Sequence, residues 1–470
     1  MVFSSLTFLF RFLPIFLSVY YILPPRYRNI CLFIGSIFFY AFGEPVYVFL
    51  IICSLLFNYA IARLMDSFSD KPVPRTMLFL FALFINFGNL IFFKYTGFFL
   101  ENINALHVLF SPSAKPLFPY IETGLPLGIS FYTFQIVSYI VDIYRKSYHS
   151  EKNILHIGVY LCMFPQLIAG PIITYSEISG EIKKRFYSGY HFEHGLQIFI
   201  LGLGSKVILA NRIGILWHSI QTIGYDSLTM PLAWLGAIAY SFQLYFDFYG
   251  YSLMAMGLGK MLGFTIPKNF DHPYLSLSMT EFFRGWHITL GKWFREYVYI
   301  PLGGNRKGTA ITIRNLLFVW FLTGFWHGAS WNFILWGMFI AFLILLEKLF
   351  LGKFLKKHRM ISVIYMILLV PSSWMLFAIN NLSDIRIYFS KLFSFHLENQ
   401  VLNLTDFLYY LKTYGLLLLC CFLCMTYLPD RLFHQFRKKP VGIIAILLIF
   451  WLSVYFLASS INNPFLYFRF

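Results

Sequence analysis

Long apolar runs alternate with short polar stretches along almost the whole chain. The apolar runs lie near residues 5–24, 30–43, 46–64, 76–93, 124–144, 154–173, 196–220, 231–263, 312–350, 361–379, 408–428 and 441–460. Because about 20 apolar residues in a helix cross the hydrocarbon core of a bilayer, the pattern predicts an all-α polytopic membrane protein of about eleven spans, some of them partial. Residues 177–194 and 265–300 mix charges with aromatic residues, which predicts interfacial or re-entrant helices.

The composition excludes a soluble surface, because 59% of the residues are hydrophobic and only 12% are charged, with a mean hydropathy of +0.67. We find no linker, low-complexity run or repeat that would divide the 470 residues. The sequence therefore predicts a single transmembrane domain over residues 1–470, with its core at about 270–340 and a final span and tail at 441–470.

The net charge of +17 comes from short basic clusters between the spans, and these form no stripe with interleaved aromatic residues. We therefore expect no nucleic-acid partner and interpret the clusters as topology signals. The clusters predicted to be cytoplasmic are Arg26 with Arg28, Lys71 with Arg75, Arg145 with Lys146, Lys353 through Arg359, and Arg431 through Lys439. Counting spans from them places both termini outside the cytoplasm.

One stretch combines membrane depth with ionisable groups. Its first half, Glu281 to Gly308, has too many charges for a lipid-facing span and suits a helix at the interface. Its second half, Asn315 to Gly337, is long enough to cross a bilayer and has His327 near its middle. An ionisable side chain at that depth costs about 3 kcal/mol or more unless it faces a cavity or a partner, so His327 is a candidate site residue. The alternative is a hydrogen-bonded structural histidine.

Several long segments resemble one known family. The segments are FRGWHITLGKWFREYVYIPLGGNR, LTGFWHGASWNFILWG, GISFYTFQIVSYIVDIYR, FPQLIAGPI, LYFDFYGYS, the opening MVFSS and the closing NPFLYFRF. They resemble the membrane-bound O-acyltransferase (MBOAT) family, in particular its bacterial branch that O-acetylates alginate and peptidoglycan. The resemblance covers nearly the whole chain and implies a helical bundle around a central tunnel.

Two histidines are candidates for the chemistry of acyl transfer. A neutral imidazole at His327 can take the proton of a hydroxyl group as that group attacks a thioester. His287, 40 residues earlier (327 − 287), can hydrogen-bond the donor carbonyl or orient a substrate, although a plain interfacial histidine is about equally expected. The resemblance implies that a deep histidine is paired with an upstream Asn or His, and His287 matches that upstream place.

Five further polar residues are candidates for binding. Asp247 lies among tyrosines in an apolar run, where it either lines the tunnel or forms a structural pair with a basic residue. Arg284, Arg295 and Arg306 suit the phosphates of a donor such as acetyl-CoA, or contact headgroups and solvent. Asn305, after two glycines, is expected at the rim of a water-filled cavity.

The tail at residues 463–470 contains one hydroxyl group, that of Tyr467. From the residues alone, the tail is an aromatic anchor at the headgroup belt. The resemblance suggests an acyl relay, because the related D-alanylation machinery has a similar aromatic and tyrosine motif on a separate small subunit. We therefore consider Tyr467 as an acyl carrier between a cytoplasmic thioester and an outer partner.

Together these observations predict an O-acyltransferase of the bacterial inner membrane. The resemblance implies that acetyl-CoA or another acetyl thioester is the donor and that an envelope or secreted polysaccharide is the acceptor. It also implies a periplasmic SGNH-type partner protein, besides contacts with membrane lipids. We expect no metal and no tightly bound cofactor, because no ligand-like spacing occurs. D-alanyl transfer to teichoic acid and a non-enzymatic transporter or channel remain the alternatives.

Overall fold

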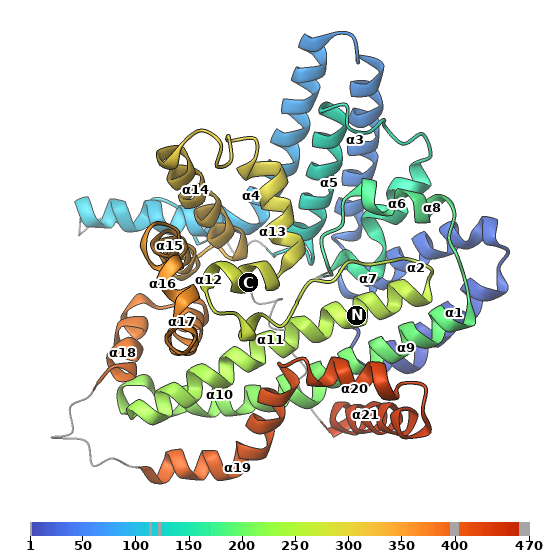
Figure 1. Cartoon of the computed structure of the whole chain (residues 1–470). Coiled ribbons are helices and arrows are strands. Elements are labelled where there is room, and N and C mark those ends of the chain that lie inside the picture. Colours follow the sequence, from blue (N-terminus) through green and yellow to red (C-terminus); the bar gives the residue numbers. More distant parts are fainter. Residues whose placement is uncertain (1, 112–114, 121–123, 169, 395–403, 460–470) are drawn as a thin grey trace. The chain divides into compact units, whose positions relative to one another are not determined.

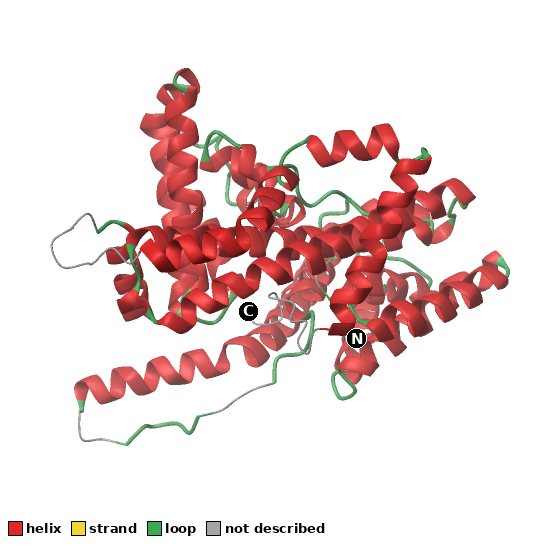
Figure 2. Cartoon of the chain, turned by 90° about the horizontal axis from the view of Figure 1, so that it is seen from below, coloured by secondary structure: helices red, strands yellow, loops and turns green. Residues whose placement is uncertain are grey.

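Helices account for every regular element in the part of the chain that the computed structural model describes, which is residues 2–111, 115–120, 124–168, 170–394 and 404–459 (Figures 1 and 2). An isolated antiparallel bridge joins Phe270 and Trp286. The expectation of an all-α fold is confirmed. The main helices are α1 (Leu13–Ile22), α2 (Arg28–Gly43), α3 (Val48–Ser67), α4 (Pro72–Phe110), α5 (Ile129–Tyr144), α6 (Ile154–Cys162), α8 (Tyr175–Lys183), α9 (Gly189–Gly204), α10 (Asn211–Ile223), α11 (Met230–Met261), α12 (Met279–Gly285), α13 (Ile288–Phe294), α14 (Thr309–His327), α15 (Trp331–Leu346), α16 (Gly352–Lys357), α17 (Arg359–Ala378), α18 (Leu382–Leu392), α19 (Leu404–Cys424), α20 (Leu428–Phe436) and α21 (Pro440–Ser459).

Eight helical stretches among the described residues are long and apolar enough to cross a membrane. They are Val48–Ser67, Pro72–Phe110, Gly189–Ile223, Thr309–His327, Trp331–Lys357, Arg359–Ala378, Leu404–Cys424 and Pro440–Ser459. The sequence pattern predicted about eleven spans. Part of the difference is helix length, because apolar helices such as α2 and α5 have 16 residues and so extend about 24 Å, less than the hydrocarbon thickness of about 30 Å.

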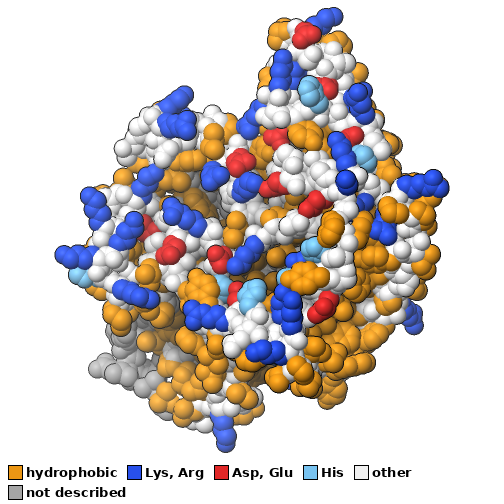
Figure 3. All heavy atoms as spheres, turned by 45° about the vertical axis from the view of Figure 1, so that its right-hand side comes forward, with side chains coloured by type: hydrophobic (Ala, Val, Ile, Leu, Met, Phe, Trp, Pro, Cys, Tyr) orange, Lys and Arg blue, Asp and Glu red, His pale blue; other side chains and the backbone are white. Residues whose placement is uncertain are grey.

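Large apolar side chains are exposed along these helices. Examples are Phe84 on α4, which is 73% exposed, and Leu416 on α19, which is 77% exposed. Figure 3 shows such side chains over broad areas of one face. Exposed apolar surface of this extent favours contact with lipid. The protein is therefore a multi-pass membrane protein.

The described chain forms two compact units by its internal contacts. Unit 1 comprises residues 1–192 and 259–267, and unit 2 comprises residues 193–258 and 268–470. Helices α9 and α11 contribute residues to both units. The expectation of one domain over 1–470 stays a prediction.

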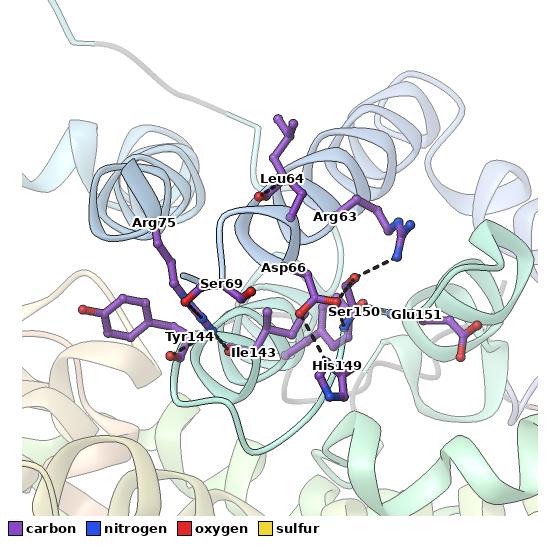
Figure 4. A network of polar contacts seen from close by, with 12 residues as sticks. Arg63, Leu64, Asp66, Ser69, Arg75, Ile143, Tyr144, His149, Ser150 and Glu151 are labelled. Carbon is purple, nitrogen blue, oxygen red and sulfur yellow. Dashed lines mark hydrogen bonds and ion pairs between the residues drawn. The ribbon is translucent and has the colours of Figure 1, made fainter. Parts of the chain in front are cut away.

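In unit 1, α3, α4 and α5 pack together, and polar contacts fasten the loop that follows α5 (Figure 4). Ser150 in this loop donates a hydrogen bond to Asp66 at 2.9 Å and accepts one from Arg63 at 3.1 Å. The buried guanidinium of Arg75 donates to the carbonyl oxygen of Ile143 at 2.6 Å. A cation at the carboxyl end of α5 also favours that helix end electrostatically.

In unit 2, α14 and α15 cross at two glycines. A Cβ atom at Gly324 would lie 2.3 Å from the carbonyl oxygen of Phe333, and one at Gly337 would lie 2.4 Å from that of Trp320. Small residues of this kind let membrane helices approach until their backbones touch. The crossing holds the carboxyl end of α14, where His327 lies, against α15.

Replacement of Gly337 by alanine is expected to destabilise the protein by about 1 to 3 kcal/mol, because the added methyl group meets backbone that cannot move aside. Gly415→Ala is the matched control, since nothing lies within 4 Å of a Cβ at that position in α19. The control should be neutral or stabilising by up to about 1 kcal/mol through helix propensity. Thermal unfolding in detergent measures both, and equal melting temperatures would contradict the backbone contact.

Candidate functional site

Unit 2 contains a partly open cavity of ≈ 230 Å³ whose lining includes both candidate histidines. Its lining residues come from the α12–α13 segment, the turn that follows it, α14 and α15. They are Phe283, Trp286, His287, Leu290, Gly291, Phe294, Arg295, Tyr299, Leu316, Val319, Trp320, Thr323, His327 and Trp336. The lining is thus mostly aromatic and aliphatic with a few polar groups, which is the usual character of a ligand pocket.

The α12–α13 segment is fixed to the rest of unit 2 by polar contacts at the start of α12. The buried carboxylate of Glu347, just after α15, accepts hydrogen bonds from the backbone N–H groups of Met279 at 2.6 Å and Thr280 at 2.9 Å. These N–H groups have no partner within their own helix, and a negative charge there also favours the helix dipole. Glu347 therefore fixes the orientation of α12.

A short antiparallel pairing then brings residue 269 beside residue 287. Asp271 donates its N–H to the carbonyl oxygen of Gly285, and Ile288 donates its N–H to that of Asn269, both at 2.9 Å. His287 sits at the end of this pairing with φ of +47°. A left-handed backbone is costly for a histidine, and such conformations cluster at functional sites.

Asn269 holds the His287 ring from one side. The side-chain oxygen of Asn269 lies 3.2 Å from Nδ1 of His287, and it also accepts hydrogen bonds from the N–H and the hydroxyl of Thr289 at 3.2 and 2.9 Å. All three residues are buried. The ring of Phe248 packs edge-on against the imidazole, with 4.7 Å between the ring centroids.

Burial changes the acid–base behaviour of His287. Removal from water lowers its pKa to about 3, since a charged imidazolium is disfavoured in apolar surroundings. His287 is therefore neutral at pH 7. Its second ring nitrogen, Nε2, is buried and has no hydrogen-bond partner among the described residues.

His327 is the last residue of α14, where the helix ends before Gly328. The residue is 7% exposed, and its ring lies edge-on among Trp326, Trp336 and Phe377, at centroid separations of 5.1 to 5.2 Å. The structure brings both candidate histidines to the wall of one cavity.

The candidate basic residues divide into two groups. Arg295 lines the cavity, and its exposed side chain also pairs with Glu296 at 3.3 Å. Arg284, Asn305 and Arg306 are exposed and do not line it. The turn that contains Asn305 is tied to α14, because the Nδ2 group of Asn315 donates to the carbonyl oxygens of Leu302 and Gly304.

Asp247 lies on α11 and is paired with Lys206, both side chains being almost fully buried. This is the structural-pair alternative that the sequence left open, and Asp247 does not line the cavity. Helices α9 and α11 approach closely here, since a Cβ at Gly250 of α11 would lie 2.7 Å from the carbonyl oxygen of Gly202 of α9. Lys206 sits in a π-helical turn, Ser205–Ala210, that follows α9.

The remaining candidate, Tyr467, lies outside the described residues, so its role stays a prediction. Within the described ranges no group of three or more His, Cys, Asp or Glu side chains is placed to hold a metal ion.

Sequence reasoning missed Asn269, Thr289 and Thr323. Thr323 lines the cavity one turn before His327. Asn269 is 18 residues from His287 and reaches it only through the short pairing of residues 269–271 with 285–288. The αL conformation that supports this pairing falls on a histidine and not a glycine, so no sequence signal marked it.

The chain matches known proteins over most of its length. Residues 144–380 match the model of the membrane-bound O-acyltransferase family. A probable alginate O-acetylase of Pseudomonas putida is 38% identical, over 84% of this chain and 81% of that protein. A peptidoglycan O-acetyltransferase of Helicobacter pylori is 37% identical, over 72% of this chain and 68% of its own. A teichoic acid D-alanyltransferase of Lacticaseibacillus rhamnosus is 32% identical over 52% of this chain. The helical fold and these matches agree: the chain belongs to the membrane-bound O-acyltransferase family and is an acyltransferase.

Proposed function

We propose that this protein passes an acetyl group from a cytoplasmic thioester, such as acetyl-CoA, across the bacterial inner membrane for O-acetylation of an envelope or secreted polysaccharide. The observation that carries the proposal is the cavity that His287 and His327 share. The two similar proteins whose names state O-acetylation, of alginate and of peptidoglycan, support acetyl as the acyl group and a polysaccharide as the acceptor.

In the proposed reaction His327 is the general base. The acceptor O–H bond breaks as its proton passes to the neutral imidazole, and the oxygen bonds to the carbonyl carbon of the acetyl group. The carbon–sulfur bond then breaks, and the imidazolium returns the proton to the leaving thiolate. The apolar aromatic rings around His327 disfavour water, which would otherwise hydrolyse the thioester.

Arg295 is the residue we propose for the donor's phosphates, because it is the arginine in the cavity wall. A guanidinium forms paired hydrogen bonds with phosphate oxygens. Its mixed position, lining the cavity yet exposed, suits a group at the entrance. For Arg284, Asn305 and Arg306, which are exposed, we propose contacts with headgroups or solvent.

The segment at residues 281–308, which contributes Arg295 to the cavity lining, should face the cytoplasm, where acetyl thioesters are made. We therefore expect that a cysteine at the exposed Lys307 reacts with a membrane-impermeant maleimide in inside-out vesicles and not in intact cells. Asn380→Cys, an exposed position after α17, is the control that should label from the opposite side. Wild-type protein corrects for the native cysteines. Labelling of residue 307 only from outside the cell would contradict this arrangement.

The function is tested by mass spectrometry of the polysaccharides in a deletion strain and in the complemented strain. The proposal expects loss of O-acetyl groups and their return with the wild-type gene. The match to a teichoic acid D-alanyltransferase makes D-alanyl transfer the second candidate. Loss of D-alanyl esters with normal acetylation would favour that candidate and contradict acetyl transfer.

The outer step requires a further protein in the proposed scheme. We propose a periplasmic SGNH-type protein that receives the acetyl group and places it on the polysaccharide. Deletion of such a partner should leave thioester cleavage by the membrane protein intact while abolishing polysaccharide acetylation.

A further inference from the structure

We propose that His287 binds a substrate hydrogen-bond donor, an N–H or O–H group, through Nε2, and that Asn269 is the positioning residue that fixes the imidazole for this task. The inference rests on the proposed acetyl transfer. It assigns Nε2 of His287 as the acceptor of a hydrogen bond from the substrate.

The hydrogen bonds around Asn269 determine which of its side-chain atoms faces the histidine. The backbone N–H of Thr289 can only donate, so the atom 3.2 Å from it must be the amide oxygen. The amide nitrogen then points to the hydroxyl of Ser252 at 3.4 Å, where it donates. The positions of the oxygen and the nitrogen in the Asn269 amide are therefore determined by its hydrogen-bond partners.

The amide oxygen in turn determines the tautomer of His287. An oxygen that only accepts requires a proton on the nitrogen facing it, so Nδ1 carries the hydrogen. In a neutral imidazole the other nitrogen, Nε2, then holds a lone pair and no hydrogen. His287 is consequently an acceptor toward the cavity ligand and cannot donate a hydrogen bond to the donor carbonyl, which is a role the sequence allowed.

A buried lone pair without a partner requires explanation. His287 is 3% exposed and is one of the residues that line the cavity, and its Nε2 has no hydrogen-bond partner among the described residues. Buried polar atoms in native proteins are nearly always paired with protein or ordered water, and a catalytic or binding role is one explanation for an exception. A ligand that brings an N–H or O–H group into the cavity would satisfy this atom.

The proposed thioester donor offers such a group, the amide N–H that lies two carbons from the sulfur in a pantetheine-type thioester. The attacking hydroxyl of the acceptor does not, because its one proton passes to His327 in the proposed reaction.

Titratable groups surround the His287 ring on several elements. They are His327 of α14, Lys292 of α13, Arg295 and Tyr299 of the turn after α13, Asp271, which pairs with Lys268 and His272, and on α11 Tyr251 and Asp247, which pairs with Lys206. An aspartate at position 269 would add a carboxylate directly beside Nδ1.

The first measurement uses non-reacting probes. S-(2-oxopropyl)-N-acetylcysteamine is compared with its analogue in which an ester oxygen replaces the amide N–H, by equilibrium binding to wild type and to Asn269→Ala. If the donor arm is the partner, the wild type binds the amide about threefold to tenfold more tightly, the effect of one hydrogen bond. The variant loses that preference. Equal binding of the two probes by the wild type contradicts the assignment.

The second measurement is the pH profile of Asn269→Asp. The carboxylate accepts the same hydrogen bonds as the amide oxygen but stabilises the imidazolium, so it raises the pKa of His287 from its low value. Protonation removes the lone pair. The rate of Asn269→Asp relative to wild type should therefore fall as the pH is lowered from about 8 to about 5.5. The control is Asn315→Ala, which removes another buried, loop-holding amide and should lower stability without changing this ratio.

The inference is overturned if Asn269→Ala changes neither probe discrimination nor kcat and the Asn269→Asp ratio is flat with pH. Failure of the proposed function is a different result, because wild-type protein would then release no thiol from acetyl-CoA whatever the probes bind.

Discussion

Replacement of His327 by alanine is expected to reduce acetyl transfer by roughly 10² to 10⁴-fold, the usual contribution of a positioned general base. The ring lies in the cavity wall at the end of α14, so its removal deletes the base and leaves the α14–α15 crossing at Gly324 and Gly337 in place. Polysaccharide acetylation in cells, normalised to the amount of protein in the membrane, measures the effect.

His358→Ala is the matched control for this variant. His358 is an exposed histidine between α16 and α17 that does not line the cavity, and its loss should leave acetylation at the wild-type level. His327→Ala activity within about tenfold of wild type would reject the role of base.

Replacement of Tyr467 by phenylalanine is expected to abolish acetylation of the polysaccharide, because it removes the one hydroxyl group of the tail at residues 463–470. The prediction comes from the sequence, since the tail lies outside the described residues. A phenol with a pKa near 10 is a better leaving group than a sugar alcohol, so an acetyl ester on Tyr467 would remain reactive toward an outer partner.

Peptide mass spectrometry should find acetylated Tyr467 in wild-type protein and not in His327→Ala. Tyr455→Phe is the control, because Tyr455 is the tyrosine of α21 and is 64% exposed. Normal polysaccharide acetylation by Tyr467→Phe would reduce the tail to a membrane anchor.

Hydropathy predicted the fold class because burial in lipid leaves few options: each backbone group must be satisfied within a helix or a closed barrel. It predicted the number of spans less well. Hydropathy reports only the length of an apolar run. It therefore does not distinguish a helix that crosses the membrane from a helix of 16 residues such as α5, most of which is buried inside unit 1. That distinction depends on tertiary packing.

The residues of the site were also only partly predictable from the sequence. His327 was identifiable because an ionisable group within an apolar run is costly. His287 was identifiable because the family resemblance implies a polar residue upstream of the deep histidine. Their common cavity requires that α12 be fixed by Glu347 and α14 by its glycine crossing.

Asn269 and the partner of Asp247 were not identifiable. Asn269 acts through an amide whose hydrogen-bond partners are 17 to 20 residues away in the sequence. Asp247 meets Lys206 because α9 and α11 approach at Gly202 and Gly250. Contacts of this range depend on how helices pack, which a local pattern does not contain.

The most direct test of the account is a single-turnover reaction between purified protein and acetyl-CoA that carries a radioactive acetyl group. The account predicts release of free thiol together with transfer of the label to the protein's own tail or to an added hydroxyl acceptor, and predicts that His327→Ala does neither. Thiol release by His327→Ala at the wild-type rate, or no release by the wild type, would contradict it.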